Sequence, residues 1–393
     1  MEQGACTLIA IGDLLLMPFG DRLEILMSEG VEACQGRERN TFDEFTGGST
    51  RIVLFGAGGL GRKVLAAFRE DGIEPLAFVD NKLAGQTVDA LNVLTPAEGA
   101  AKWGQSAVFV VTIWAAWADT MQQQVQSLRK LGCANVSSFI PVLWKYSHLL
   151  PHVQVDLPSR VLAQKCQVME AFDLCADEDS RGEFVAQVRW RLHGDFEALN
   201  RPIRDQYWQG DVVRLKQNAV FVDAGAFDGD TFAQFVEFCG GKFRAAYLFE
   251  PDRGNLLSLQ KRLSAMPEAI RDRVHVLPSA VAEDTYDVSF HGGSGPSSAP
   301  GAGREVVHCV SLDHALPEPP DLIKYDIEGF ELLALNGTRL IIKEHQPTLA
   351  VCAYHIQDHI WQIPLLIKSI HPGYRFYLRP HGQIWETVCY AVA

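Results

Sequence analysis

Two glycine-rich turns of opposite charge suggest two different ligands. The stretch FVDAGAFDGD at 221–230 follows an apolar run and carries Asp223, Asp228 and Asp230. The stretch VLFGAGGLGRK at 53–63 carries no acid and ends in two cations. Both patterns are typical of the turn from a buried strand into a helix. Their opposite charges therefore predict different chemistry in the two halves of the chain.

The first turn has the spacing of a dinucleotide-binding loop. Gly56, Gly58 and Gly61 form G-x-G-x-x-G between a predicted strand and a predicted helix. The N-terminus of that helix attracts anions, and Asp80 ends the next predicted strand, where a carboxylate can bind ribose hydroxyls. We predict a nucleotide held through its phosphates. The alternative, a scaffold in which the glycines serve only the tight turn, remains open.

The second turn is unsuited to a pyrophosphate. Its carboxylates would repel a phosphate by roughly a few kcal/mol per close pair when partly desolvated. S-adenosylmethionine has no phosphate and carries a sulfonium and an ammonium. Glu250 ends the next predicted strand and is placed to accept ribose hydroxyls, while Gly225 and Gly229 allow close approach of the backbone. The turn therefore favours a sulfonium cofactor.

A third group of polar residues follows two later strands. Asp326, Glu328 and His355 lie at or just past the ends of adjacent predicted strands, the edge of a parallel sheet where ligands bind. In one version, His355 or Asp326 accepts a hydroxyl proton. In the other, all three hold a divalent cation that lowers the pKa of the hydroxyl. His359 stands four residues after His355, and we expect it at the surface.

The elements that must position these residues alternate between strand and helix. This pattern predicts an α/β protein with two Rossmann-like, doubly wound sheets joined by a helical connector. The predicted divisions are an N-terminal appendage at 1–50, a Rossmann-like nucleotide-binding domain at 51–145, the connector at 146–210 and a catalytic domain at 211–393.

The composition limits the classes of binding partner and the cellular compartment that we expect for the protein. The 393 residues carry a formal net charge of -13, which argues against binding to nucleic acid or to an anionic membrane surface. The nine cysteines are scattered without a C-x-x-C pair, which suits a reducing cytoplasm, so we expect a cytoplasmic protein. No uninterrupted apolar run reaches about 18 residues, so a membrane span is not expected.

Several motifs in order resemble the FkbM family of S-adenosylmethionine-dependent methyltransferases. They are FVDAGAFDGDTF, YLFEPD, LIKYDIEGFELLALNG, AYH and the closing ETVCYAVA, and the resemblance covers roughly residues 200–393. It implies a seven-stranded, mostly parallel class I methyltransferase fold and O-methylation of a carbohydrate or secondary-metabolite hydroxyl. Residues 51–145 resemble, more loosely, the nucleotide-binding Rossmann module attached to some sugar-modifying enzymes.

The resemblance also implies roles for single residues. Asp326 would lie beside the transferring methyl group, and Tyr325 would face away from the site because side chains alternate along a strand. Tyr207, before the first strand of this half, is placed to cover the cofactor. The implied cofactor contacts are Asp223, Gly225, Ala226 and Gly229 at the methionine end, Glu250 at the ribose, and Ser279 and Ala280 at the adenine.

Two other functions compete with methyl transfer. Residues 51–145 could drive an NAD-dependent sugar-nucleotide oxidoreductase, although no histidine lies there to serve hydride transfer. Both α/β halves could instead form a non-catalytic nucleotide-binding protein. In the methyltransferase interpretation the partner is a small-molecule or carbohydrate acceptor, and assembly into a homo-oligomer is compatible with the sequence.

Overall fold

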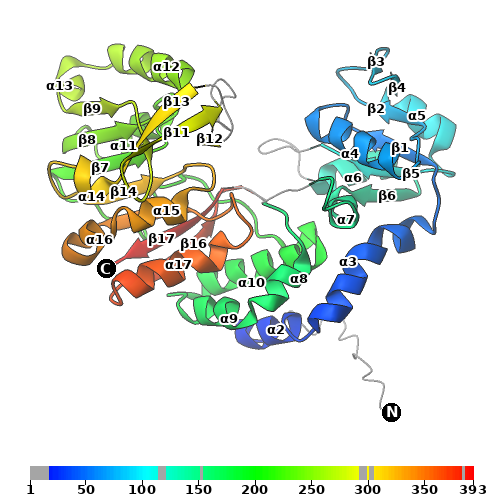
Figure 1. Ribbon diagram of the computed structural model, residues 1–393, viewed down its shortest axis with the longest axis horizontal. Helices are drawn as coiled ribbons and strands as arrows, with labels where there is room; N and C mark the ends of the chain where they lie inside the picture. The colour runs from blue at the N-terminus through cyan, green and yellow to red at the C-terminus, as the bar shows by residue number, and fades with distance from the viewer. Residues whose placement is uncertain (1–16, 114–120, 151–153, 292–298, 301–304, 383–385) are drawn as a thin grey trace. The chain divides into compact units, whose positions relative to one another are not determined.

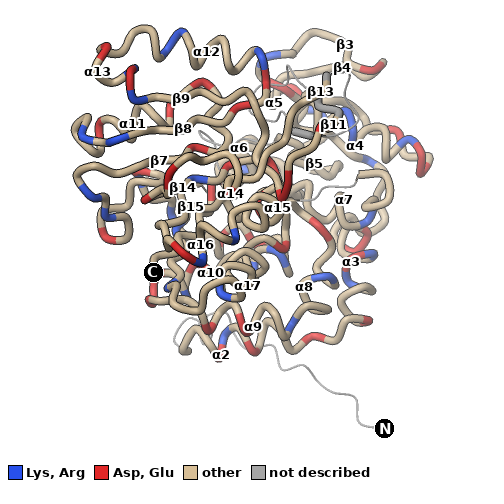
Figure 2. The backbone as a smooth tube through the Cα atoms, turned by 60° about the vertical axis from the view of Figure 1, so that its left-hand side comes forward, with Lys and Arg blue, Asp and Glu red and all other residues tan. Residues whose placement is uncertain are grey.

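The computed structural model describes residues 17–113, 121–150, 154–291, 299–300, 305–382 and 386–393 (Figure 1). The chain divides into two compact units. Unit 1 consists of Met1–Met169 with Phe184–Asn200, and unit 2 of Glu170–Glu183 with Arg201–Ala393. Each unit contains a mostly parallel sheet, which confirms the predicted α/β class. Acidic and basic residues are interspersed along the backbone of both units (Figure 2).

Unit 1 contains a six-stranded sheet in the order β3-β4-β2-β1-β5-β6. Only β3 is antiparallel to its neighbour. All residues of β1 and β5 are buried, as expected for strands covered on both faces. The strands are β1 (Ile52–Phe55), β2 (Ala77–Val79), β3 (Thr87–Val88), β4 (Leu91–Leu94), β5 (Val108–Val111) and β6 (Asn135–Ser138).

Helices connect these strands and precede the sheet. Helix α5 begins with a capping box, in which Thr95 and Glu98 satisfy each other's backbone N–H groups. Helices α9 and α10 contain residues of both units. The helices are α2 (Phe19–Leu26), α3 (Val31–Thr46), α4 (Gly59–Glu70), α5 (Pro96–Trp103), α6 (Met121–Lys130), α7 (Ile140–Lys145), α8 (Pro158–Ala163), α9 (Lys165–Asp173) and α10 (Glu178–His193), followed by the 3-10 helix η1 (Phe196–Ala198).

Unit 2 contains a seven-stranded sheet in the order β16-β17-β15-β14-β7-β8-β9. The five strands from β15 to β9 are parallel, and β17 runs antiparallel to both of its neighbours. The strands are β7 (Ala219–Ala224), β8 (Phe243–Phe249), β9 (Val274–Leu277), β14 (Leu322–Tyr325), β15 (Thr348–Cys352), β16 (Arg375–Pro380) and β17 (Thr387–Val392).

A second, smaller sheet of unit 2 has the order β10-β13-β11-β12. Its strands are β10 (Ala280–Val281), β11 (Tyr286–His291), β12 (Ala299–Pro300) and β13 (Glu305–Val310). The helices of unit 2 are α11 (Asp230–Phe238), α12 (Arg253–Ser264), α13 (Glu268–Arg271), α14 (Leu312–Ala315), α15 (Glu331–Asn336), α16 (Arg339–His345) and α17 (His359–Ile370).

Helices cover both faces of the seven-stranded sheet. On one face, Phe232 and Phe235 of α11 and Leu259 of α12 pack in a core cluster with Phe221 of β7. On the other face, Tyr325 of β14 donates a hydrogen bond to Thr338, immediately before α16 (2.8 Å). Tyr325 thus faces away from the side chain of its neighbour Lys324, as the strand alternation predicts.

No helix in the described parts of the chain is both long enough and apolar enough to span a bilayer.

Candidate active site

The polar residues of unit 2 gather where the order of its parallel strands reverses. The chain runs from β7 outward to β8 and β9, then returns to β14 on the other side of β7. The turns after β7 and β14 therefore lie side by side at the carboxyl edge, the position at which open α/β sheets bind ligands. A Cβ on Gly225, after β7, would lie 1.9 Å from the carbonyl oxygen of Asp326, after β14. The structure thus brings together two motifs that are about 100 residues apart.

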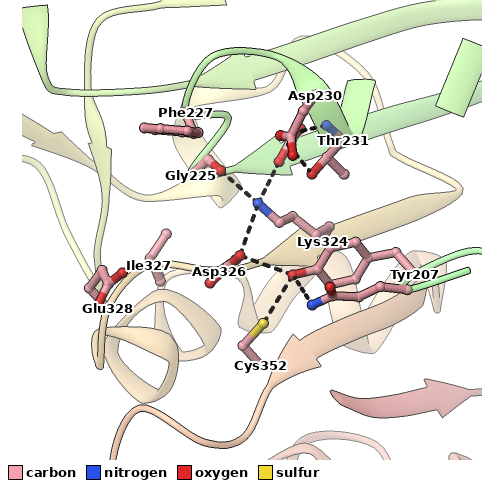
Figure 3. A network of polar contacts seen from close by, with 12 residues as sticks. Tyr207, Gly225, Phe227, Asp230, Thr231, Lys324, Asp326, Ile327, Glu328 and Cys352 are labelled. Atoms are coloured by element: carbon pink, nitrogen blue, oxygen red, sulfur yellow. Dashed lines mark hydrogen bonds and ion pairs between the residues drawn. The ribbon is translucent and has the colours of Figure 1, made fainter. Parts of the chain in front are cut away.

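Asp326 is surrounded by hydrogen-bond donors (Figure 3). The hydroxyl of Tyr207 donates to its Oδ2 (3.0 Å), and the hydroxyl of Tyr354 lies 3.5 Å from its Oδ1. Two basic groups add charge, with Lys324 Nζ 3.8 Å from Oδ2 and His355 Nε2 3.4 Å from Oδ1. These groups stabilise and orient the carboxylate, whose side chain remains 27% exposed.

His355 is buried, and its two ring nitrogens face different partners. Nδ1 bonds Glu331 Oε1 (2.7 Å). Nε2 has no hydrogen-bond partner in the described structure, and it points toward Asp326 and toward Glu328 Oε2, 3.9 Å away. Burial disfavours the charged ring, but the charge of Glu331 outweighs this and raises the pKa of His355 to about 9. At neutral pH His355 is therefore a cation that carries a proton on Nε2.

Glu328 is the partly exposed carboxylate of this group. Burial raises its pKa to about 7, opposed by the nearby charge of His355, and 28% of its side chain is exposed. Its φ is 55°, in the left-handed region that non-glycine residues seldom adopt. Tyr207 (φ 68°) and Glu386 (φ 67°) share this conformation beside Asp326. Such strained residues cluster at functional sites, where the surrounding structure holds them in place.

Each acid of the glycine turn has a partner in the structure. Asp223 is fully buried, with Oδ1 3.0 Å from the buried ammonium of Lys324, its neighbour in register on β14. Asp228 pairs with Arg262 (2.5 Å). Asp230 accepts the backbone N–H of Thr231 (2.7 Å) in the first turn of α11. The sequence could not reveal these partners, because they depend on the strand order and on the packing of α12.

The turn still fits S-adenosylmethionine. Asp223 Oδ2 is buried and has no hydrogen-bond partner among the described residues, so it can accept a donor from the cofactor. Glu250 directly follows β8, and its Oε2 accepts the N–H of Phe227 (2.8 Å), which leaves one lone pair for a ribose hydroxyl. Its Oε1 accepts the N–H of Asp252 (2.8 Å) and the side-chain amide of Asn255 (3.3 Å). Glu250 therefore braces the turn and keeps acceptor capacity.

Other predicted cofactor residues have evident packing roles. Gly229 has φ 83°, and a Cβ there would lie 2.6 Å from Leu259 of α12. Ala226 is buried in the core cluster. Ser279 lies between β9 and β10, and Ala280 is the first residue of β10 in the smaller sheet. Their contact with an adenine stays a prediction.

Comparison with known proteins agrees with this geometry. Residues 223–384 match the family model described as "Methyltransferase FkbM domain". This part of unit 2 is therefore similar to an FkbM methyltransferase domain. No curated protein sequence matches the chain.

The solved structures extend the likeness beyond the FkbM domain. The crystal structure of methyltransferase FkbM from Methylobacillus flagellatus KT aligns with 93% of this chain and 99% of its own, with a TM-score of 0.73 and 23% identity. At that identity the match shows a shared fold. A precorrin-6y C5,15-methyltransferase from Geobacter metallireducens GS-15 (TM-score 0.29, 11% identity, 45% of this chain and 80% of that one) is too distant to support an argument. The same holds for an rRNA methylase from Streptococcus thermophilus (TM-score 0.30, 17% identity, 49% and 96%).

The proposal that Asp326, Glu328 and His355 hold a metal ion gains no support from the geometry. Within the described ranges, no group of three or more His, Cys, Asp or Glu residues is arranged to hold a metal ion. Asp326, Glu328 and His355 do converge, but His355 Nδ1 is bonded to Glu331 and Nε2 faces both carboxylates at 3.4 and 3.9 Å. These contacts are those of an ion-pair cluster.

The glycines of unit 1 serve two purposes. A Cβ on Gly56 (φ 115°) would lie 2.8 Å from Ile113, and one on Gly61 would lie 1.9 Å from the carbonyl of Gly56, so both are required by packing. Gly58, at the N-cap of α4, faces open space. The carboxylate of Asp80 accepts the N–H of Ala57 (3.1 Å), just as Glu250 braces the turn of unit 2.

Sequence reasoning missed several residues of the site. Lys324 and Glu331 lie inside the quoted motif LIKYDIEGFELLALNG, but their roles appear only with the pairing of β7 and β14. The surface position expected for His359 is wrong, because it is buried with Nδ1 3.1 Å from Glu331 Oε2. Glu386 opens the quoted motif ETVCYAVA, and Gln206 directly precedes Tyr207, but no role was assigned to either residue. The hydroxyl of Tyr207 reaches Asp326, and its predicted position over the cofactor stays a prediction.

Proposed function

We propose that the chain is an S-adenosylmethionine-dependent O-methyltransferase that acts on a hydroxyl of a carbohydrate or of a similar secondary-metabolite acceptor. The observation that carries this proposal is the convergence of His355 Nε2, Asp326 and Glu328 beside the glycine turn after β7. A buried donor without a partner between two carboxylates suits a hydroxyl, which both donates and accepts hydrogen bonds.

The residues divide the work of methyl transfer among them. When bound, S-adenosylmethionine supplies a methyl group on a sulfonium, which is a good leaving group. Glu328 accepts the hydroxyl proton at Oε2, because a carboxylate with a pKa of about 7 is matched to neutral pH and its exposure lets the proton leave. Asp326 and His355 orient the acceptor oxygen. Such alignment contributes up to about 7–11 kcal/mol in favourable intramolecular cases.

Titration calorimetry and a transfer assay on the full chain test the proposal. We expect binding of S-adenosylmethionine and of its demethylated product, and transfer of a labelled methyl group to members of a panel of methyl glycosides. Glu328→Gln should bind the cofactor normally and transfer the methyl group slowly, whereas Glu344→Gln, at an exposed position of α16, should behave as wild type. Binding of NAD without any binding of S-adenosylmethionine would contradict the proposal.

For unit 1 we propose a Rossmann-like nucleotide-binding domain. Its parallel strands have the order β4-β2-β1-β5-β6, with the order reversing between β1 and β5, and the open space at Gly58 adjoins the N-terminus of α4. Both features suit an anion. Calorimetry with NAD and UDP-sugars checks this. The cytoplasmic location, a homo-oligomeric state and the lack of nucleic-acid or membrane partners stay predictions from the sequence.

A further inference from the structure

Five side chains close a ring of hydrogen bonds through Asp326. The Tyr207 hydroxyl donates to Asp326 Oδ2 (3.0 Å) and accepts from Gln206 Nε2 (3.0 Å). Gln206 Nε2 also donates to Glu386 Oε2. The hydroxyl of Tyr354 completes the ring, 3.3 Å from Glu386 Oε1 and 3.5 Å from Asp326 Oδ1. Figure 3 shows the side chains of Tyr207 and Lys324 both reaching Asp326.

The number of protons in the ring determines which group donates and which accepts in each hydrogen bond. Tyr354 has one hydroxyl proton, so it can meet both carboxylates only when Glu386 carries a proton of its own. Burial and the charge of Asp326 both raise the pKa of Glu386, which agrees with this requirement. Other charged or titratable groups that face it are His355, Glu328 and Cys352. With Glu386 protonated, two chains of donors run from Gln206 to Asp326. One passes through Tyr207, and the other passes through Glu386 and Tyr354.

The segment that supplies Gln206 and Tyr207 is held on the sheet by its backbone. The N–H of Ile203 donates to the carbonyl of Pro380 (2.8 Å), and the N–H of Tyr207 donates to the hydroxyl of Tyr390 (2.9 Å). His381 lies between them, with Nδ1 3.2 Å from the carbonyl of Ile203 and Nε2 2.9 Å from the Tyr390 hydroxyl. These bonds fix the strained φ of Tyr207 and aim its phenol at Asp326.

Three members of the ring lie outside the region that matches the FkbM model. That region spans 223–384, whereas Gln206 and Tyr207 precede it and Glu386 follows it. The matched region therefore does not include them, although Glu386 opens the motif ETVCYAVA. They come from two separate segments, and each segment contains a residue in the left-handed conformation, Tyr207 and Glu386.

We propose that Gln206, Tyr207, Tyr354 and Glu386 are positioning residues that fix the carboxylate plane of Asp326 for the acceptor hydroxyl. The inference rests on the proposed methyl transfer. Tyr207 occupies Oδ2, so the acceptor is directed to the side of Oδ1, where His355 Nε2 points. A carboxylate free to rotate would lose this alignment, and a displacement of about 1 Å can cost about a hundredfold in rate.

Variants of the full chain test the positioning role, because loss of positioning should change kcat without changing KM. Tyr207→Phe and Glu386→Leu should lower kcat by about tenfold to a hundredfold, with KM for S-adenosylmethionine unchanged. Glu386→Gln should keep wild-type activity, because its amide can donate to Tyr354 and accept from Gln206, as a protonated Glu386 does. Tyr247→Phe is the control. It removes a similar hydrogen bond, from the hydroxyl of Tyr247 on β8 to Glu318 (3.1 Å), and should leave kcat unchanged.

Hydrogen exchange by mass spectrometry gives a second readout that needs no acceptor. Glu386→Leu should speed amide exchange over residues 203–208, and Glu386→Gln should not. Wild-type exchange and wild-type kcat in Glu386→Leu would overturn the inference while leaving the proposed function intact. Failure of the wild-type chain to methylate any methyl glycoside in the panel, or to bind S-adenosylmethionine, would instead overturn the proposed function and the positioning role with it.

Discussion

The pH dependence of methyl transfer should report two residues of the site. Below about pH 7 Glu328 becomes protonated and can no longer accept the hydroxyl proton, so kcat should fall as the pH is lowered. Above about pH 9 His355 loses the proton that Nε2 donates, so kcat should fall again. We expect a bell-shaped profile with a plateau between these values, measured as kcat against pH with saturating S-adenosylmethionine.

Substitution of Glu328 separates the two limbs of the pH profile. Glu328→Gln should lower kcat by about 10²-fold to 10⁴-fold and remove the acid limb, while the alkaline limb set by His355 remains. An unchanged acid limb in this variant would show that another group accepts the proton. The exposed Glu344→Gln serves as the control for loss of a carboxylate elsewhere in unit 2.

The buried pair of Asp223 and Lys324 should dominate the stability of the glycine turn. Burial opposes the charged ammonium, but Asp223 and Asp326 raise the pKa of Lys324, so it stays protonated. Lys324→Met would leave Asp223 buried and unpaired and should lower the free energy of unfolding by about 3–5 kcal/mol. Denaturant titration measures this. Arg262→Met, which breaks the partly exposed pair with Asp228, should cost only about 0–1 kcal/mol.

A double variant checks the origin of that loss. Asp223→Asn with Lys324→Met removes both charges and should recover much of the stability that Lys324→Met loses. If the effects of the two single variants simply add, the residues do not act as a pair. The sequence could predict that Asp223 and Asp326 belong to a site, since both follow apolar runs. It could not predict Lys324 as their partner, because adjacency of β7 and β14 is set by the whole sheet.

At the scale of elements, the turn after β7 depends on the close approach of β14. Gly225 has φ 85°, and an added Cβ would lie 1.9 Å from the Asp326 carbonyl. Gly225→Ala should therefore lower the free energy of unfolding by more than about 1 kcal/mol and weaken binding of S-adenosylmethionine, measured by calorimetry. Gly210→Ala, at an exposed glycine with open space around it, should be neutral. Normal cofactor affinity in Gly225→Ala would show that the turn adapts.

The alternation of strands and helices let the sequence predict the α/β class and the edge at which the site lies. Buried strands such as β7 and β14 read as apolar runs, and the glycines after β1 and β7 mark tight turns. The smaller sheet of β10 to β13 was not predicted, because two of its strands have only two residues. The sequence also could not show why Gly61 and Gly229 must be glycines, because the neighbours that a Cβ would meet are brought close only by the fold.

At the scale of the whole molecule, the two units should respond separately to ligands. A ligand at 100 times its Kd stabilises the unit that binds it by about 2.7 kcal/mol. In differential scanning calorimetry of the full chain, S-adenosylmethionine should therefore raise the melting temperature of unit 2 and leave that of unit 1 unchanged. Two variants identify which transition belongs to which unit. Lys324→Met should lower the melting temperature of unit 2. Gly61→Ala should lower that of unit 1, because the added Cβ would meet the Gly56 carbonyl. A single transition that moves with both variants would show that α9 and α10, which contain residues of both units, make the chain unfold as one.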